Sequence, residues 1–159
     1  MSNNFVDLTT QRLNRCLENN VAVVVGSVDA SGEPSTCRAL ALTSSDDLNN
    51  LTVYVPVATS RQTIANVTST RRLTVVATHP IDHFSVQLKG KAAEARPARE
   101  DEAPLIHRGF DGFAEILNQI GIPPRVTNAV TREPALAIEM QVEEIYDQTP
   151  GPKAGTRVR

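Results

Sequence analysis

Six short apolar runs, separated by turn residues, constrain the fold of this chain more than any other feature. They cover residues 21–28, 34–43, 51–57, 72–78, 84–95 and 135–146. The runs are rich in the β-branched residues that favour strands. Most of the connections between them have hairpin length, which favours antiparallel pairing over βαβ units. The pattern therefore predicts a mainly β fold with helices, built on a six-stranded antiparallel barrel, and Gly90 inside the fifth run predicts a bulge.

Helical signals lie in three segments. Residues 5–19 have apolar side chains at helical spacing, and residues 61–67 follow the potential cap Thr59-Ser60. Residues 98–126 form a helical insert between the fifth and sixth strands, in which Gly109 and Gly112 favour two helices over one. The sequence thus predicts one barrel domain over residues 1–147 that contains this insert. Residues 148–159 are rich in Pro and Gly, and they predict a C-terminal tail.

Composition excludes several classes of protein. The 159 residues suffice for one domain, and 16 Lys and Arg against 18 Asp and Glu disfavour a nucleic-acid binder. No apolar run is long enough to cross a membrane, and no secretory leader is visible, so we expect a cytoplasmic protein. The two cysteines cannot build a disulfide framework. The three histidines lack metal-ligand spacing, so no metal site is predicted.

The segment that follows the third strand has the features of an anion site. Thr59, Ser60 and Arg61 stand where a strand passes into a helix. The first N–H groups of a helix have no partner within it, and the helix dipole favours negative charge there. Two hydroxyls add donors, and an arginine can bind phosphate with two hydrogen bonds. The alternative is an ordinary helix cap beside a solvated arginine.

Arg38 is a charge inside an otherwise apolar strand. Such a residue is seldom buried without a partner. It either extends from the end of the barrel to meet Asp46 or Asp47, or strand pairing brings it beside Arg61 as a second phosphate ligand. Two arginines near one helix start would suit a phosphomonoester.

The order of these motifs resembles the pyridoxamine 5′-phosphate oxidase-like, FMN-binding split-barrel family. The motifs are RALAL at residues 38–42, LTVYVPV at 51–57, TSRQTIANV at 59–67, RLTVVA at 72–77 and FSVQLKGKAAEA at 84–95. The resemblance covers residues 21–95. It implies a split β-barrel that binds FMN at the interface of a homodimer.

The resemblance also implies roles for individual residues. The phosphate group of FMN would contact Arg38, Thr59, Ser60, Arg61 and Gln62. The isoalloxazine ring would lie along Ala39, Leu40, Ala41, Val55 and Pro56, and Ser85 would supply a polar group from the next hairpin. Thr43 and Gln62 stand where the family often has cations, and the C-terminal signature of true pyridoxamine-phosphate oxidases has no counterpart.

Two functions follow from this resemblance. The first is an FMN-dependent oxidoreductase that acts on an unknown small molecule, with no catalytic residue assigned. The second is a non-catalytic flavin carrier, a sensor, or a cofactor-free split-barrel dimerisation module, which the departures at Thr43 and Gln62 favour.

The sequence also carries expectations about how two copies of the chain would assemble. Strands 21–28 and 72–78 are apolar on both faces, so a second copy of the chain is expected to cover the open face. The helical insert either covers the flavin of that second copy through Phe110 and Phe113 or packs on its own barrel.

Overall fold

The computed structural model of the 159-residue chain describes Leu13, Leu17 and residues 20–159, without the side chain of Glu94. The helix predicted over residues 5–19 lies outside this part except for Leu13 and Leu17. The strands are β1 (Ala22–Val28), β2 (Pro34–Arg38), β3 (Ala41–Ser44), β4 (Asn50–Pro56), β5 (Arg72–Thr78), β6 (Ser85–Pro97), β7 (Ala135–Asp147) and β8 (Thr156–Arg157). The helices are η1 (Val57–Thr59), α2 (Arg61–Thr70), η2 (Glu100–Glu102), α3 (Ala103–Gln119) and α4 (Pro124–Asn128).

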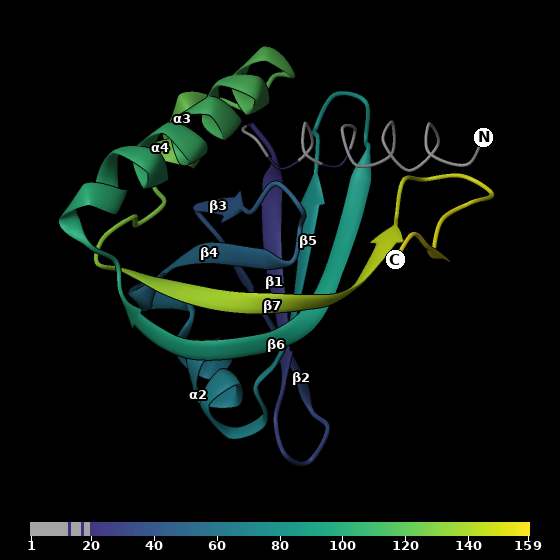
Figure 1. The fold of residues 1–159 in the computed structure, drawn as a ribbon. Helices are drawn as coiled ribbons and strands as arrows, with labels where there is room; N and C mark the ends of the chain where they lie inside the picture. Colours follow the sequence, from purple (N-terminus) through teal and green to yellow (C-terminus); the bar gives the residue numbers. More distant parts are fainter. Residues whose placement is uncertain (1–12, 14–16, 18–19) are drawn as a thin grey trace.

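The strands form one antiparallel sheet that curls into a half-barrel (Figure 1). Its order is β2-β1-β5-β6-β7-β4-β3, and β8 pairs with β7. Two consecutive amides join the ends of this order, since Ala39 N–H donates to Val23 O at 3.0 Å and Leu40 N–H donates to Tyr54 O at 2.8 Å. The chain therefore passes from one end of the sheet to the other within two residues, which holds the sheet in its curl.

This crossing corrects the predicted count of six strands. The single strand expected over residues 34–43 is two strands, β2 and β3, which pair with β1 and β4 respectively. The apolar pattern runs through Ala39 and Leu40 without a turn residue, so it carries no signal of the change in hydrogen-bonding partner. The short strand β8 adds an eighth and lies within the segment expected to be a tail. The bulge predicted at Gly90 is confirmed by a register shift between Lys89 and Gly90.

Side chains that point into the barrel form its core. The most deeply buried of them include Val25, Val53, Val55, Val75, Leu88 and Ile138. Helix α2 packs against β1 and β6 and adds Val67 to this core. Its buried Asn66 donates from Nδ2 to Ser27 Oγ at 3.1 Å, so the polar side of the helix is also fixed to the sheet.

Helix α3 packs on the outside of its own barrel, over β3. It runs without a break from Ala103 to Gln119, so the expectation of two helices divided at Gly109 and Gly112 is wrong. A Cβ at Gly109 would lie 2.7 Å from Ala41 Cβ. The glycine thus serves close packing of helix on strand rather than a break. Ile106 and Phe110 bury the outer face of the sheet together with Leu40, Ala41, Tyr54, Ala135 and Ala137.

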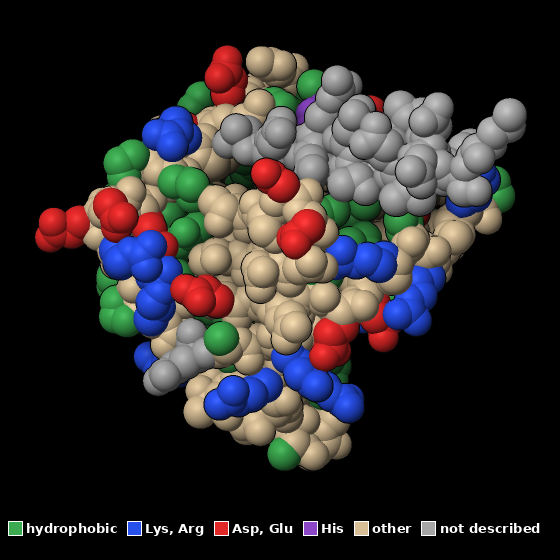
Figure 2. Space-filling view, in the orientation of Figure 1, with side chains coloured by type: hydrophobic (Ala, Val, Ile, Leu, Met, Phe, Trp, Pro, Cys, Tyr) green, Lys and Arg blue, Asp and Glu red, His purple; other side chains and the backbone are tan. Residues whose placement is uncertain are grey.

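A cluster of charged side chains anchors the start of this insert. Basic and acidic groups lie side by side where β6 passes towards α3 (Figure 2). The buried Glu102 carboxylate accepts hydrogen bonds from Arg96 at 2.7 and 2.8 Å, from the Arg99 backbone N–H at 2.7 Å and from the Tyr54 hydroxyl at 3.1 Å. The cluster therefore connects β4, β6 and η2.

Candidate functional site

The phosphate group of the cofactor is predicted to bind at the start of α2. Ser60 is the N-cap residue, but its side chain makes no capping hydrogen bond. Its buried hydroxyl instead donates to Pro56 O at 2.7 Å, so it holds the turn that leads out of β4. The first backbone N–H groups of α2 therefore have no side-chain cap, and Thr59, Arg61 and Gln62 around them are exposed. An uncapped helix start beside an exposed arginine suits an anion.

Gln62 contributes less to anion binding at the start of α2 than a cationic side chain would. Its Nε2 donates to Asn66 Oδ1 at 2.9 Å, one turn along the same helix. The side chain is therefore committed to α2, and Arg61 supplies the formal charge at the helix start.

Arg38 is the last residue of β2 and pairs with Val24 across the sheet. Its guanidinium carbon lies 4.3 Å from the centroid of the Phe113 ring on α3, a cation–π contact. Burial lowers the pKa of the guanidinium, and no carboxylate in the described part of the chain forms an ion pair with it. Of the interpretations open at the sequence level, pairing with Asp47 has no support, because Asp47 contacts Ser45 and Asn49.

The residues predicted to line the flavin ring are buried. Ala39 and Val55 belong to the barrel core, whereas Leu40 and Ala41 lie under α3. Pro56 is also buried, at the end of β4. Ser85 begins β6, where its hydroxyl donates to His83 O at 2.9 Å and lies 3.0 Å from Thr78 Oγ1.

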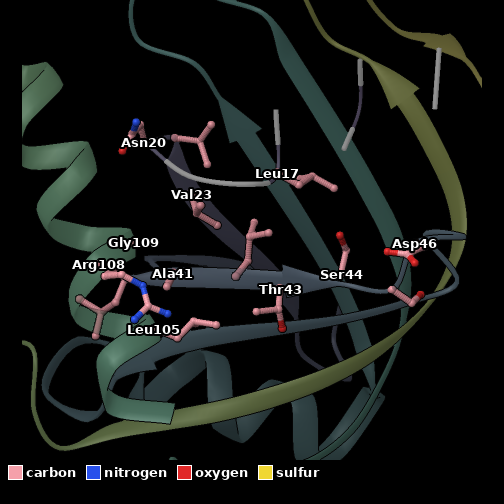
Figure 3. A pocket seen from close by; sticks show the side chains of 14 residues that line it. Leu17, Asn20, Val23, Ala41, Thr43, Ser44, Asp46, Leu105, Arg108 and Gly109 are labelled. Carbon is pink, nitrogen blue, oxygen red and sulfur yellow. The ribbon is translucent and has the colours of Figure 1, made fainter. Parts of the chain in front are cut away.

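A pocket of about 340 Å³ lies between β3, the start of β1 and α3 (Figure 3). It is lined by Leu17, Asn20, Val21, Val23, Leu40, Ala41, Leu42, Thr43, Ser44, Ser45, Asp46, Leu105, Arg108 and Gly109. Its volume is in the range of small-molecule sites. Two residues of the predicted ring set, Leu40 and Ala41, contribute to its wall. The lining combines these apolar residues with polar side chains such as Thr43, Asp46 and Arg108, and it includes no residue of α2.

Sequence reasoning missed the α3 side of this pocket. Arg108 extends from α3 towards β3, and Ser44 and Asp46 lie along the strand on the opposite side (Figure 3). Arg108 has the sequence context of any exposed helical arginine, so no local signal distinguishes it. Only the packing of α3 on β3 brings it to the wall.

The described residues form neither a metal-ligand cluster nor a membrane-spanning helix. Within the part of the chain that the structure describes, no three His, Cys, Asp or Glu side chains lie together as metal ligands would. Over the same residues, no helix has the length and apolar character needed to cross a bilayer.

Comparison with known proteins identifies the fold. No family model matches the sequence, and no curated protein matches it. Among solved structures, a Clostridium acetobutylicum protein related to general stress protein 26, of the pyridoxinephosphate oxidase family, matches with a TM-score of 0.54 and 17% identity, over 90% of this chain and 91% of that chain. The chain has the split-barrel fold. The predicted resemblance is therefore confirmed at the level of fold.

Solved structures whose names point to other ligands also match this chain. An F420 reductase matches with a TM-score of 0.54 and 12% identity, over 83% of this chain and 94% of that chain. HutZ, a heme storage protein from Vibrio cholerae, matches with a TM-score of 0.50 and 10% identity, over 86% of this chain and 92% of that chain. At such identities the likeness is one of fold, and the ligand has to be argued from the side chains of this split barrel.

Proposed function

We propose that this split barrel binds a flavin-type cofactor, FMN, and acts as an oxidoreductase on a small molecule. The observation that carries the proposal is the uncapped start of α2 with the exposed Arg61, together with Arg38, a guanidinium without a carboxylate partner in the described chain. Both features suit a phosphomonoester. The F420 reductase and the pyridoxinephosphate oxidase relative add support at the level of fold.

The residues of the chain would bind and orient the cofactor. Arg61 and the first N–H groups of α2 would hold the phosphate. The ring would lie along the strand at Leu40 and Ala41, which also border the pocket. A bound flavin supplies two-electron redox chemistry, which no side chain in this set provides. We assign no catalytic acid or base.

The second candidate is a non-catalytic split barrel: a flavin carrier, a sensor or a cofactor-free dimerisation module. Two observations favour it. Helix α3 buries the outer side of β3 at Ala41. The neutral residues Thr43 and Gln62 stand where the family that the sequence resembles often has cations.

The absorbance spectrum of the purified protein separates these candidates. Oxidised-flavin bands support the proposed function, and turnover with a chemical reductant then distinguishes an enzyme from a carrier. A Soret band would instead favour heme, and a protein that stays colourless after incubation with FMN would favour the cofactor-free module.

Replacing Arg61 by Ala is expected to weaken FMN binding by about 1.5–3 kcal/mol, or roughly 10- to 150-fold, because one charge-assisted contact to phosphate is lost. Fluorescence titration with FMN measures the change. Arg72→Ala is the matched control, since Arg72 is also exposed but begins β5 beyond the other end of α2. Unchanged affinity in the Arg61 variant would contradict the assignment.

We also propose that the chain forms a homodimer through the outer face of β1 and β5. Val24 and Val76 pair across these strands and point away from the core, and Val24 is 37% exposed. A shallow hollow of about 510 Å³ lies on the same face, over Gly26 and Thr74. An exposed sheet face of this kind buries apolar surface when a second copy covers it.

Light scattering is expected to give twice the chain mass of 17.2 kDa at micromolar concentration. Val24→Lys should shift the protein towards the monomer, because a charge would be buried in the interface. Ile81→Lys is the control, since Ile81 is 55% exposed in the turn between β5 and β6. A monomer mass for the unaltered chain would refute the dimer.

A further inference from the structure

Two aromatic rings on α3 each support an arginine from another part of the chain. Arg38 lies over Phe113 at 4.3 Å, and Arg132 lies over Phe110 at 4.4 Å. The two rings contact each other edge to face, with centroids 6.3 Å apart and planes at 68°. Both rings are buried, so each guanidinium rests on a firmly held platform.

The two arginines differ in how their charge is compensated. Arg132 Nη1 donates to Asp111 Oδ1 at 2.6 Å, which completes an ion pair on α3 itself. Arg38 has no such pair with any described carboxylate, and within the described part of the chain its favourable electrostatic contact is the ring of Phe113. Among the described residues, Arg38 thus has no carboxylate to compensate its charge, and it lies against a helix that restricts its position.

Stacking leaves the hydrogen-bonding capacity of a guanidinium intact. When a ring contacts the flat face of a guanidinium, the five N–H donors lie in the plane of the group and point outward. A stacked arginine therefore has less rotational freedom and still presents its donor edge to an anion. Such restriction before binding improves recognition, because less freedom is lost when the ligand arrives.

We propose that Phe113 is a positioning residue that holds the Arg38 guanidinium for the phosphate of the cofactor. The inference rests on the proposed function and extends it, since it makes phosphate recognition depend on α3. Phe113 does not itself touch the phosphate. It acts through Arg38, and the equivalent pair, Phe110 with Arg132, serves only to hold the insert together.

Affinities for FMN and riboflavin test this, because their ratio isolates the contribution of the phosphate. The unaltered protein is expected to prefer FMN. Phe113→Leu should reduce this preference roughly three- to tenfold, as a lost cation–π contact implies, with riboflavin affinity unchanged. Phe113→Tyr keeps a ring and should retain the preference. Phe110→Leu is the matched control on the same helix, and it should also leave the ratio unchanged.

A double-mutant cycle guards against a merely structural effect. Arg38→Met removes the cation, so Phe113→Leu should cause no further fall in the FMN preference of that variant. An unchanged or increased preference in Phe113→Leu, an equal fall in Phe110→Leu, or additive losses with Arg38→Met would each overturn the proposal. If the unaltered protein binds both ligands equally or neither, the proposed phosphate site itself fails, and the positioning role fails with it.

Discussion

Replacing Glu102 by Gln is expected to lower the free energy of unfolding by about 3 kcal/mol, because it leaves a buried cluster without its negative charge. The Glu102 side chain is 9% exposed and accepts two hydrogen bonds from Arg96 and one from Tyr54. Loss of the charge leaves the partly buried Arg96 with only the outer carboxylate of Glu139, at 3.3 Å. Urea unfolding at neutral pH measures the change.

The same carboxylate makes stability depend on pH. The hydrogen bonds from Arg96, followed by that from the Arg99 backbone, lower the pKa of Glu102 from 4.5 to about 2. Since the folded protein has the lower pKa, the stabilisation is complete above the ordinary value of 4.5 and is lost as the pH falls towards 2. The difference between the unaltered protein and Glu102→Gln is therefore expected to shrink progressively over this interval.

Asp101→Asn is the control for both measurements. Asp101 is the neighbouring residue, but its side chain is 78% exposed, and its contact with Arg99 is 3.3 Å long. An exposed pair of this kind contributes at most about 1 kcal/mol. A Glu102→Gln variant that is no less stable than Asp101→Asn would contradict the structural role of the cluster.

Gly90→Ala is expected to destabilise the barrel by about 3 kcal/mol, at the upper end of what overpacking costs. A Cβ at this position would lie 1.9 Å from the backbone oxygen of Gln141, and backbone cannot move aside as a flexible side chain can. The position is the bulge where the register of β6 and β7 shifts. The substitution therefore strains the pairing between these two strands.

Gly26→Ala provides the comparison within the same sheet. Its added Cβ would meet Thr74 Cβ at 3.8 Å, an ordinary contact. Alanine in a strand also loses less backbone entropy on folding than glycine, so this change should be neutral or stabilise the protein by about 0.5 kcal/mol. Denaturant midpoints of the two variants measure the difference, and equal midpoints would argue against the close approach at Gly90.

Much of the fold is predictable because strand burial has a periodic signal. The positions of β1, β4, β5, β6 and β7 follow from their apolar runs, and α2 follows from the residues before it. The crossing at Ala39 and Leu40 is not predictable in this way, since hydrogen-bonding partners can change while the apolar pattern continues. The continuity of α3 was also missed. A glycine that permits close packing within a helix cannot be distinguished in the sequence from a glycine that ends one.

Part of the candidate site was likewise predictable from the sequence, and part was not. The start of α2 combines neighbouring residues, so sequence reasoning could locate it. The stack of Arg38 on Phe113 joins residues of β2 and α3, and the Glu102 cluster joins β4, β6 and η2. Contacts between residues so far apart in the sequence depend on how the helical insert packs against the barrel. Neither the local composition nor the residue spacing predicts that packing.

The pairing of β4 with β7 also has a consequence for the order of events during synthesis. Strand β4 pairs with β3 on one side, and its other partner is β7, where Asn50 lies opposite Gln141 and Pro56 opposite Ala135. Most of the chain must leave the ribosome before that partner exists. Until then, one edge of the β3–β4 hairpin presents open hydrogen-bonding groups that can join another chain. The nascent protein is thus most prone to aggregate while its C-terminal third is still being made.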